Sequence, residues 1–124
     1  MPQFSKTSLE RLETCDQRLQ DLMHEVIKET DITILCGHRG EADQNKAFAE
    51  GKSKLRYPKS KHNSLPSMAV DITPYPIDWN DLESFRELAG IVKEKAEQLG
   101  IDIEWGGECF GKFVDMPHYQ LKEA

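Results

Sequence analysis

Two short stretches of the sequence carry side chains that could bind a metal ion. In "SKHNSLPSMAVDI", His62 precedes Asp71 by nine positions, and "DMPHY" near the end of the chain adds Asp115 and His118. Two imidazoles and one carboxylate are a ligand set that suits zinc and leaves a fourth tetrahedral position for water. If His62, Asp71 and His118 were the ligands, Asp115 would be free to transfer protons.

The local pattern predicts how these side chains are presented. "MAVDIT" is typical of a short strand in which Val70 and Ile72 share one face and Asp71 points to the other. A proline between Asp115 and His118 disfavours a helix there, so both are presented from a turn or a strand edge. Spacing alone leaves a second interpretation open: a core histidine bonded to a backbone carbonyl, and an aspartate that ends a strand.

The rest of the chain mixes helices and strands without regular alternation. Apolar residues recur at three- and four-residue steps from Leu9 to Ile27, behind a Thr7 or Ser8 cap, which predicts one long first helix. This mixture favours an α+β fold, a small antiparallel sheet with helices packed on one side. The other expected elements are a strand over 31–36, a short helix over 41–50, a loop over 52–67, a helix from an Asn80 or Asp81 cap to Gly100, and extended segments over 101–105 and 112–121.

Composition excludes several classes of protein. A chain of 124 residues with a formal net charge of -6 and no long basic block predicts one domain that binds no nucleic acid. The apolar stretches are too short to cross a bilayer and the start lacks a secretory signal, so we expect a cytoplasmic monomer without stable membrane association. Cys15, Cys36 and Cys109 are an odd, widely spaced set, which favours neither a disulfide framework nor a cysteine zinc site.

Two further stretches each allow two interpretations. The basic residues before His62 form either a solvated loop or a basic rim for an anionic substrate; they are Lys52, Lys54, Arg56, Lys59 and Lys61. The segment "YPIDW", which ends at Trp79, either lines a binding groove or packs a loop. Tryptophans are more often buried than exposed, which favours the core for Trp79 and Trp105.

Taken together, "CGHRGEADQ", "SKHNSLPSMAVDI" and "DMPHY" resemble the family of zinc D-Ala-D-Ala carboxypeptidases and phage L-alanyl-D-glutamate endopeptidases, which shares its fold with the hedgehog signalling domain. The resemblance covers Cys36 to Gln120. Its motif is Ser-x-His, a spacer, Ala-x-Asp, then Asp/Glu-x-Pro-His, and all four parts stand here in order. The spacer "NSLPSMAV" is longer than is common, and we expect the loop at "SLPS" to absorb the added residues without moving Asp71.

The resemblance implies a role for each matched residue. His62, Asp71 and His118 look like the zinc ligands, and Asp115 looks like the catalytic acid/base. Arg39 resembles a residue that stabilises the oxyanion or holds a substrate carboxylate. Ser60 and Gln44 resemble further substrate-contacting positions.

The resemblance also implies an activity for the whole chain, 1–124, as a single zinc peptidase catalytic domain. We expect hydrolysis of the L-Ala-D-Glu bond in the stem peptide of peptidoglycan, with D-Ala-D-Ala carboxypeptidase activity as the alternative. A non-catalytic zinc-binding module is a second alternative, but it would have no use for a free carboxylate at Asp115. The missing secretion signal favours a phage lysis enzyme that stays in the cytoplasm until lysis.

Overall fold

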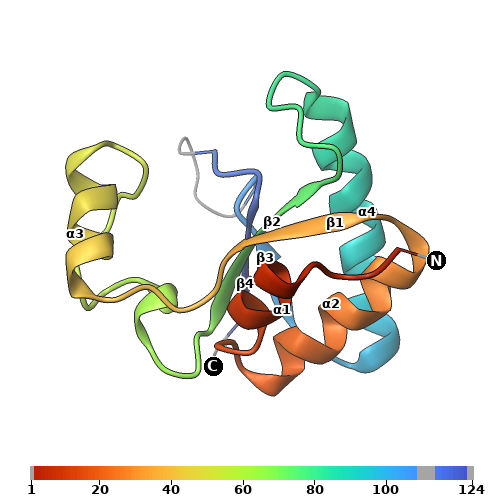
Figure 1. Ribbon diagram of the computed structural model, residues 1–124, viewed down its shortest axis with the longest axis horizontal. Helices are drawn as coiled ribbons and strands as arrows, with labels where there is room; N and C mark the ends of the chain where they lie inside the picture. The colour runs from red at the N-terminus through yellow and green to blue at the C-terminus, as the bar shows by residue number, and fades with distance from the viewer. Residues whose placement is uncertain (1, 109–113, 123–124) are drawn as a thin grey trace.

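The computed structural model describes residues 2–108 and 114–122 and has the expected α+β architecture (Figure 1). Its sheet has four strands in the order β1-β2-β4-β3, and all neighbouring strands are antiparallel. The strands are β1 (Ile32–Cys36), β2 (Ala69–Pro74), β3 (Ile103–Trp105) and β4 (His118–Leu121). The helices are α1 (Lys6–Leu12), α2 (Gln17–Glu29), α3 (Glu41–Ala49), the short 3-10 helix η1 (Lys61–Asn63) and α4 (Leu82–Leu99).

The hydrophobic core lies between one face of the sheet and helices α1, α2 and α4. Val70 and Ile72 of β2 are fully buried there, in one hydrophobic cluster with Val26 of α2 and Val92 of α4. Asp71, between the two buried residues of its strand, is only partly buried. The predicted alternation is therefore confirmed, and it leaves the opposite face of the sheet for polar side chains.

The prediction of one long first helix is wrong, because the chain breaks between α1 and α2. Cys15 in the break forms a parallel bridge with Ser67. The Ser67 N–H donates to the Thr14 carbonyl, and the Asp16 N–H donates to the Ser67 carbonyl, each at 2.8 Å. Cys15 is buried, so the apolar periodicity continues through a point where the backbone leaves the helix. The break thus supports the loop between the first two predicted ligands.

The helix ends follow local capping chemistry. Helix α4 begins after Asp81, whose carboxylate accepts a hydrogen bond from the backbone, and ends at Gly100 with φ of 71°, both as predicted. Helix α1 begins after Ser5, not after Thr7 or Ser8, because the Ser5 hydroxyl accepts the Ser8 N–H. The start of the chain is therefore helical slightly earlier than expected.

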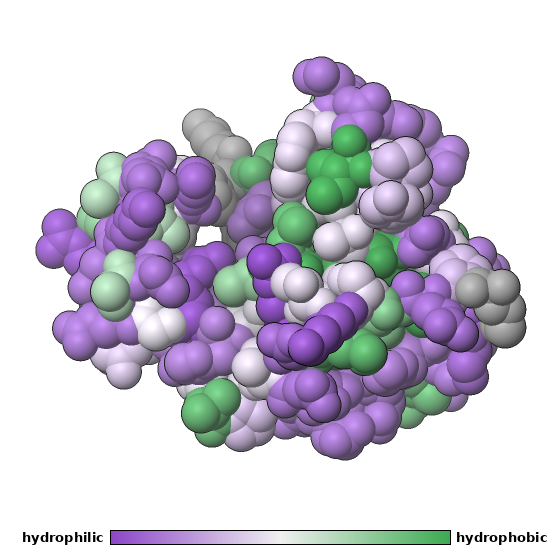
Figure 2. All heavy atoms as spheres, viewed as in Figure 1, coloured by the Kyte–Doolittle hydropathy of each residue, from purple (hydrophilic) through white to green (hydrophobic). Residues whose placement is uncertain are grey.

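Helix α3, the loop that follows it and the first residue of η1 form an arm, residues 41–61, that stands apart from the helices of the core (Figure 1). Among the described residues, those of α3 take no part in the hydrophobic core. The arm is held together from within by Gln44, whose side-chain amide donates to the Leu55 carbonyl at 2.6 Å and to Ser53 Oγ at 3.0 Å. Its visible surface is mainly hydrophilic, and a small gap opens between its upper part and the rest of the molecule (Figure 2).

Within the described part of the chain, no helix is both long enough and apolar enough to cross a membrane.

Candidate metal centre and catalytic cleft

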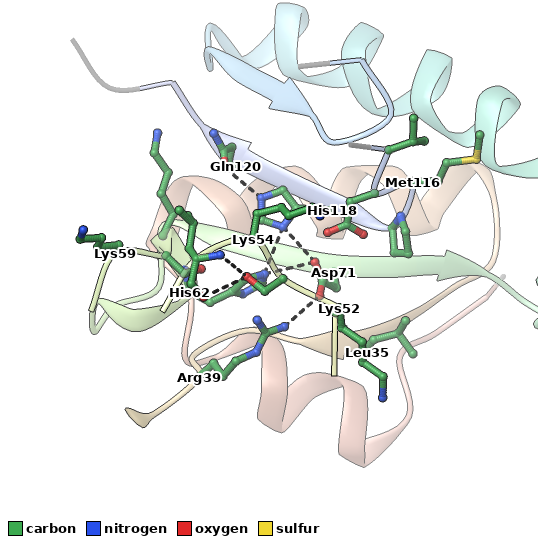
Figure 3. Close-up of a pocket in the computed structure, with 18 of the residues that line it drawn as sticks. Leu35, Arg39, Lys52, Lys54, Lys59, His62, Asp71, Met116, His118 and Gln120 are labelled. Carbon is green, nitrogen blue, oxygen red and sulfur yellow. Dashed lines mark hydrogen bonds and ion pairs between the residues drawn. The ribbon is translucent and has the colours of Figure 1, made fainter. Parts of the chain in front are cut away.

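Three separate segments bring His62, Asp71 and His118 together (Figure 3). Asp71 of β2 and His118 of β4 are direct partners in the antiparallel register, so their side chains leave the same face of the sheet. His62 comes from η1, which is capped by Ser60: its hydroxyl accepts the His62 N–H at 3.2 Å. The structure thus brings the three predicted ligands together, and their binding of a metal ion stays a prediction.

The three facing atoms form a nearly equilateral triangle. His62 Nε2, Asp71 Oδ1 and His118 Nδ1 lie 3.2 Å from one another. Three corners of a tetrahedron with edges of that length lie about 2.0 Å from its centre, which is the usual length of a bond from zinc to nitrogen or oxygen. The triangle therefore has the dimensions of three ligands around a tetrahedral ion, with the fourth corner open.

The outer nitrogen of each imidazole fixes the tautomer. His62 Nδ1 lies 2.7 Å from the Gly37 carbonyl, and His118 Nε2 lies 2.8 Å from Gln120 Oε1. The Gly37 carbonyl can only accept, so Nδ1 of His62 carries the hydrogen. Gln120 donates its Nε2 to Glu104 at 3.3 Å, which leaves its oxygen to accept from His118. Neutral imidazoles in these tautomers point two lone pairs at the carboxylate oxygen, and this donor set fits a bound cation.

Attraction between the Asp71 carboxylate and the two imidazoles shifts the pKa values of Asp71 and His62. Burial alone would raise the pKa of Asp71, but the imidazoles of His62 and His118 hold that pKa well below its usual range. Burial works to lower the pKa of His62, but the charge of Asp71 and its hydrogen bond raise it to about 10. A proton on His62 therefore competes with any metal ion for this site.

Asp115 lies in the same cavity but outside the triangle of ligand atoms. Its N–H donates to the Gly106 carbonyl at 2.9 Å, and its own carbonyl accepts the His118 N–H at 3.1 Å. Burial, followed by the negative charge of Asp71, raises the pKa of the Asp115 carboxyl. A raised carboxyl pKa, close to a set of metal ligands, suits a group that must both accept and return a proton near neutral pH.

The cavity has a volume of about 760 Å³ and lies between the arm and the sheet. Arg39 and Ser60 line it, while their contact with a substrate stays a prediction. The guanidinium of Arg39 is held between two partners: Nη2 lies 3.4 Å from Asp71 Oδ2, and Nη1 donates to Gln44 Oε1 at 3.0 Å. Arg39 thus links Asp71, one of the candidate metal ligands, to the arm.

Gln44 differs from the other predicted substrate residues in its position. It is 0% exposed, and among the described residues it is not one of those that line the cavity. Its oxygen accepts hydrogen bonds from Arg39 and from Asn63 Nδ2, the latter at 3.2 Å. In this position Gln44 supports Arg39 from behind, while its contact with a substrate stays a prediction.

Sequence reasoning missed the residues that support the ligands. Gln120 could have been found, because it lies two residues beyond His118 on a strand and so shares its face. Gly37 could not, because it acts through a backbone carbonyl whose position depends on the whole fold. At Gly106, a Cβ atom would lie 2.2 Å from the Asp115 carbonyl oxygen, so the close approach of the two segments requires glycine.

The fold and the site define a member of the phage L-alanyl-D-glutamate peptidase family, and the chain belongs to that family: its sequence model matches residues 1–120. The L-alanyl-D-glutamate peptidase of Escherichia phage T5 is 34% identical over 111 residues, which are 85% of this chain and 80% of that protein. The crystal structure of Serratia marcescens L-Ala D-Glu endopeptidase ChiX superposes with a TM-score of 0.81 at 27% identity, over 96% of this chain and 89% of that one. The family resemblance drawn from the motifs is confirmed.

Proposed function

We propose that this chain is a zinc-dependent peptidase that hydrolyses the L-Ala-D-Glu bond in the stem peptide of peptidoglycan. The observation that carries the proposal is the triangle of His62, Asp71 and His118 in one cavity with Asp115, in a chain of this family. The names of the phage T5 and Serratia proteins support the choice of bond. We propose that residues 1–124 act as one catalytic domain.

The donor set supports zinc as the metal. Two imidazole nitrogens and one carboxylate oxygen, with room for a fourth ligand, are typical of catalytic zinc sites in hydrolases. When bound, zinc supplies a Lewis acid that polarises the scissile carbonyl and lowers the pKa of a water molecule.

The residues around the ligands have separate tasks in this reaction. Asp115 accepts a proton from the attacking water and returns it to the leaving amine, a role that its raised pKa favours. Arg39 faces the cavity beside Asp71 and can share the negative charge that develops on the carbonyl oxygen. Its fixed position between Asp71 and Gln44 means that little reorganisation is needed when the charge appears.

The arm supplies positive charge to the cavity. Of the five basic residues singled out in the sequence, four line it: Lys52, Lys54, Lys59 and Lys61. The fifth, Arg56, lies over the ring of Phe48 at 4.7 Å from its centroid. This distribution favours the basic rim over a merely solvated loop, and the stem peptide carries carboxylates that such a rim would attract.

Mass analysis of purified peptidoglycan after digestion with the zinc-loaded protein tests the proposal. We expect whole stem peptides detached from the glycan and a new amino terminus on D-Glu. Free D-Ala with the stem peptides still attached would instead identify a D-Ala-D-Ala carboxypeptidase. Absence of any product from the zinc-loaded protein would identify a non-catalytic binding module. Loss of turbidity of permeabilised cells would support a role in lysis.

The role of Asp115 is tested separately by Asp115→Asn, which keeps the shape of the side chain but cannot accept the proton. We expect turnover to fall on the order of a hundred- to ten-thousand-fold, with zinc content unchanged. Asp102→Asn is the matched control, because Asp102 is exposed and lies outside the described lining of the cavity. Turnover close to that of the control in a zinc-loaded Asp115→Asn protein would remove Asp115 from the reaction.

A further inference from the structure

The two tryptophans of the chain have opposite environments. Trp105 is buried, and its indole N–H donates to the Met116 carbonyl at 2.7 Å, as expected for a core residue. Trp79, in the loop between β2 and α4, is 57% exposed and lines the cavity that holds the metal ligands. Of the two interpretations of "YPIDW", the structure therefore favours the lining of a groove, and the expectation that Trp79 lies in the core is wrong.

The indole of Trp79 is held in a fixed orientation. It stacks on the ring of Phe85 with a centroid distance of 5.7 Å and an interplanar angle of 18°. Phe85 belongs to α4 and is only 2% exposed, so it provides a rigid support. Phe85 covers one face of the indole in this stack. The exposed area of Trp79 therefore lies on the rest of the ring. A rigid aromatic ring loses little conformational entropy when it binds a ligand.

Trp79 is not an isolated apolar residue on the surface. Leu55 of the arm and Val114 beyond β3 are also exposed, at 44% and 54%, and both line the same cavity. Single exposed apolar residues are ordinary, but three from separate segments around one cavity are typical of a ligand-binding surface. The cavity thus combines lysines from the arm with an aromatic ring from the loop before α4.

The substrate of the proposed reaction also has a charged part and a part that can pack on an aromatic ring. The inference rests on that proposed function. On the carboxyl side of the L-Ala-D-Glu bond the stem peptide carries carboxylates. On the amino side, L-Ala is joined through a lactyl group to the sugar ring of N-acetylmuramic acid. One residue spans at most about 3.6 Å, so the sugar must lie close to the cleaved bond. A pyranose ring presents a face of C–H groups that packs well on an aromatic ring.

We propose that Trp79 forms a glycan subsite, in which the exposed indole stacks on the N-acetylmuramic acid ring attached to L-Ala. The stem peptide then runs from Trp79, across the metal ligands, toward the lysines of the arm. This subsite makes the protein prefer stem peptides that are still attached to glycan over peptides already released. It also fixes the direction in which the peptide lies, so that its first bond is presented for cleavage.

The test compares two soluble substrates: a disaccharide tetrapeptide, and the same tetrapeptide with an acetyl group in place of the glycan. We expect the wild-type protein to have a kcat/KM about five- to tenfold higher for the glycan-linked substrate, mainly through KM. Trp79→Ala should lose this preference, because its kcat/KM falls much further for the glycan-linked substrate than for the acetyl peptide. Trp79→Phe should keep most of the preference. Tyr75→Ala is the control, because Tyr75 is 61% exposed on the same loop but is not among the described residues that line the cavity.

An equal fall for both substrates in Trp79→Ala would show that the indole contacts the peptide and would overturn the glycan subsite. An unchanged preference in that variant would overturn it as well. Inactivity of the wild-type protein toward both substrates would count against the proposed function. In that case a binding measurement with the free disaccharide tests the subsite. Quenching of indole fluorescence by the free disaccharide, lost in Trp79→Ala, would support the subsite. The same quenching in both proteins would refute it.

Discussion

Gly106 controls how closely the segment that carries Asp115 approaches the sheet. Its N–H donates to the His118 carbonyl at 2.7 Å, and its carbonyl accepts the Asp115 N–H at 2.9 Å. A Cβ atom added here would lie 2.2 Å from the Asp115 carbonyl oxygen and 2.9 Å from His118 Cβ. Gly106→Ala therefore pushes directly on the backbone of Asp115, the proposed acid/base, and on the side chain of His118, a proposed metal ligand.

The size of the effect follows from these distances. A carbon atom and a carbonyl oxygen rarely approach closer than about 3.3 Å, so the Asp115 segment must move by about 1 Å. A displacement of that size in a catalytic group costs roughly a hundredfold in rate. Overpacking of this kind also lowers the free energy of unfolding by about 1–3 kcal/mol. We therefore expect Gly106→Ala to fold, to be less stable, and to lose about 99% of its turnover.

The assay is release of stem peptides from peptidoglycan by the zinc-loaded protein, with a thermal unfolding curve to confirm a folded variant. Gly90→Ala in α4 is the matched control, because a Cβ there meets no atom within 4 Å. Alanine is also the better helix former by about 0.5–1 kcal/mol, so the control should be slightly more stable and fully active. Wild-type turnover in a folded Gly106→Ala protein would refute the reasoning, because the two segments could then separate without moving Asp115.

Three further predictions concern the metal. His62→Ala should lower the zinc content well below one ion per chain, since two ligands hold zinc poorly. His24→Ala, at an exposed position, should leave the zinc content unchanged. Full zinc occupancy of His62→Ala in a metal analysis would remove His62 from the site. Gln120→Ala should weaken zinc binding about 10–100-fold, because His118 loses the partner that orients it. Competition with a chelator measures this affinity, and Gln98→Ala, on the exposed side of α4, should bind zinc normally in that assay. The pKa of His62 is raised to about 10 in the metal-free protein, so zinc must displace a proton at any lower pH. Zinc affinity should therefore fall as the pH falls, and uptake at neutral pH should release about one proton per ion; constant pH on zinc addition to an unbuffered sample would contradict this.

The motifs and the family resemblance singled out His62, Asp71 and His118, which the structure brings together, and local patterns predicted most of the fold. Alternation in "MAVDIT" placed Asp71 on the polar face, and the Asp81 and Gly100 caps defined α4. The break between α1 and α2 was missed because Cys15 satisfies the helical periodicity while its backbone pairs with Ser67. A periodic pattern reports which side chains are buried, and it does not report whether the backbone between them stays helical.

The environments of individual side chains were harder to predict, because they depend on contacts between distant segments. Gln44 matches a substrate-contacting position by its place in the motif, yet the loop at Leu55 folds back and buries it. Tryptophan is a residue type that is usually buried, yet Trp79 is exposed and stacks on Phe85, which is buried in its place. In both cases the deciding neighbour lies several residues away, in a different element or loop.

The pairing of Asp71 with His118 has a consequence for how the sheet forms. A slip of one residue between β2 and β4 would turn His118 toward the core and bring Tyr119, which is 0% exposed, to the polar face. Such a slipped chain would offer a metal ion only two of its three ligands. A metal ion that bound the correct pairing and not the slipped one would shift refolding chains toward the correct pairing by mass action. On the proposed metal site, the ion would therefore select the correct register of β2 and β4 as well as take part in the reaction.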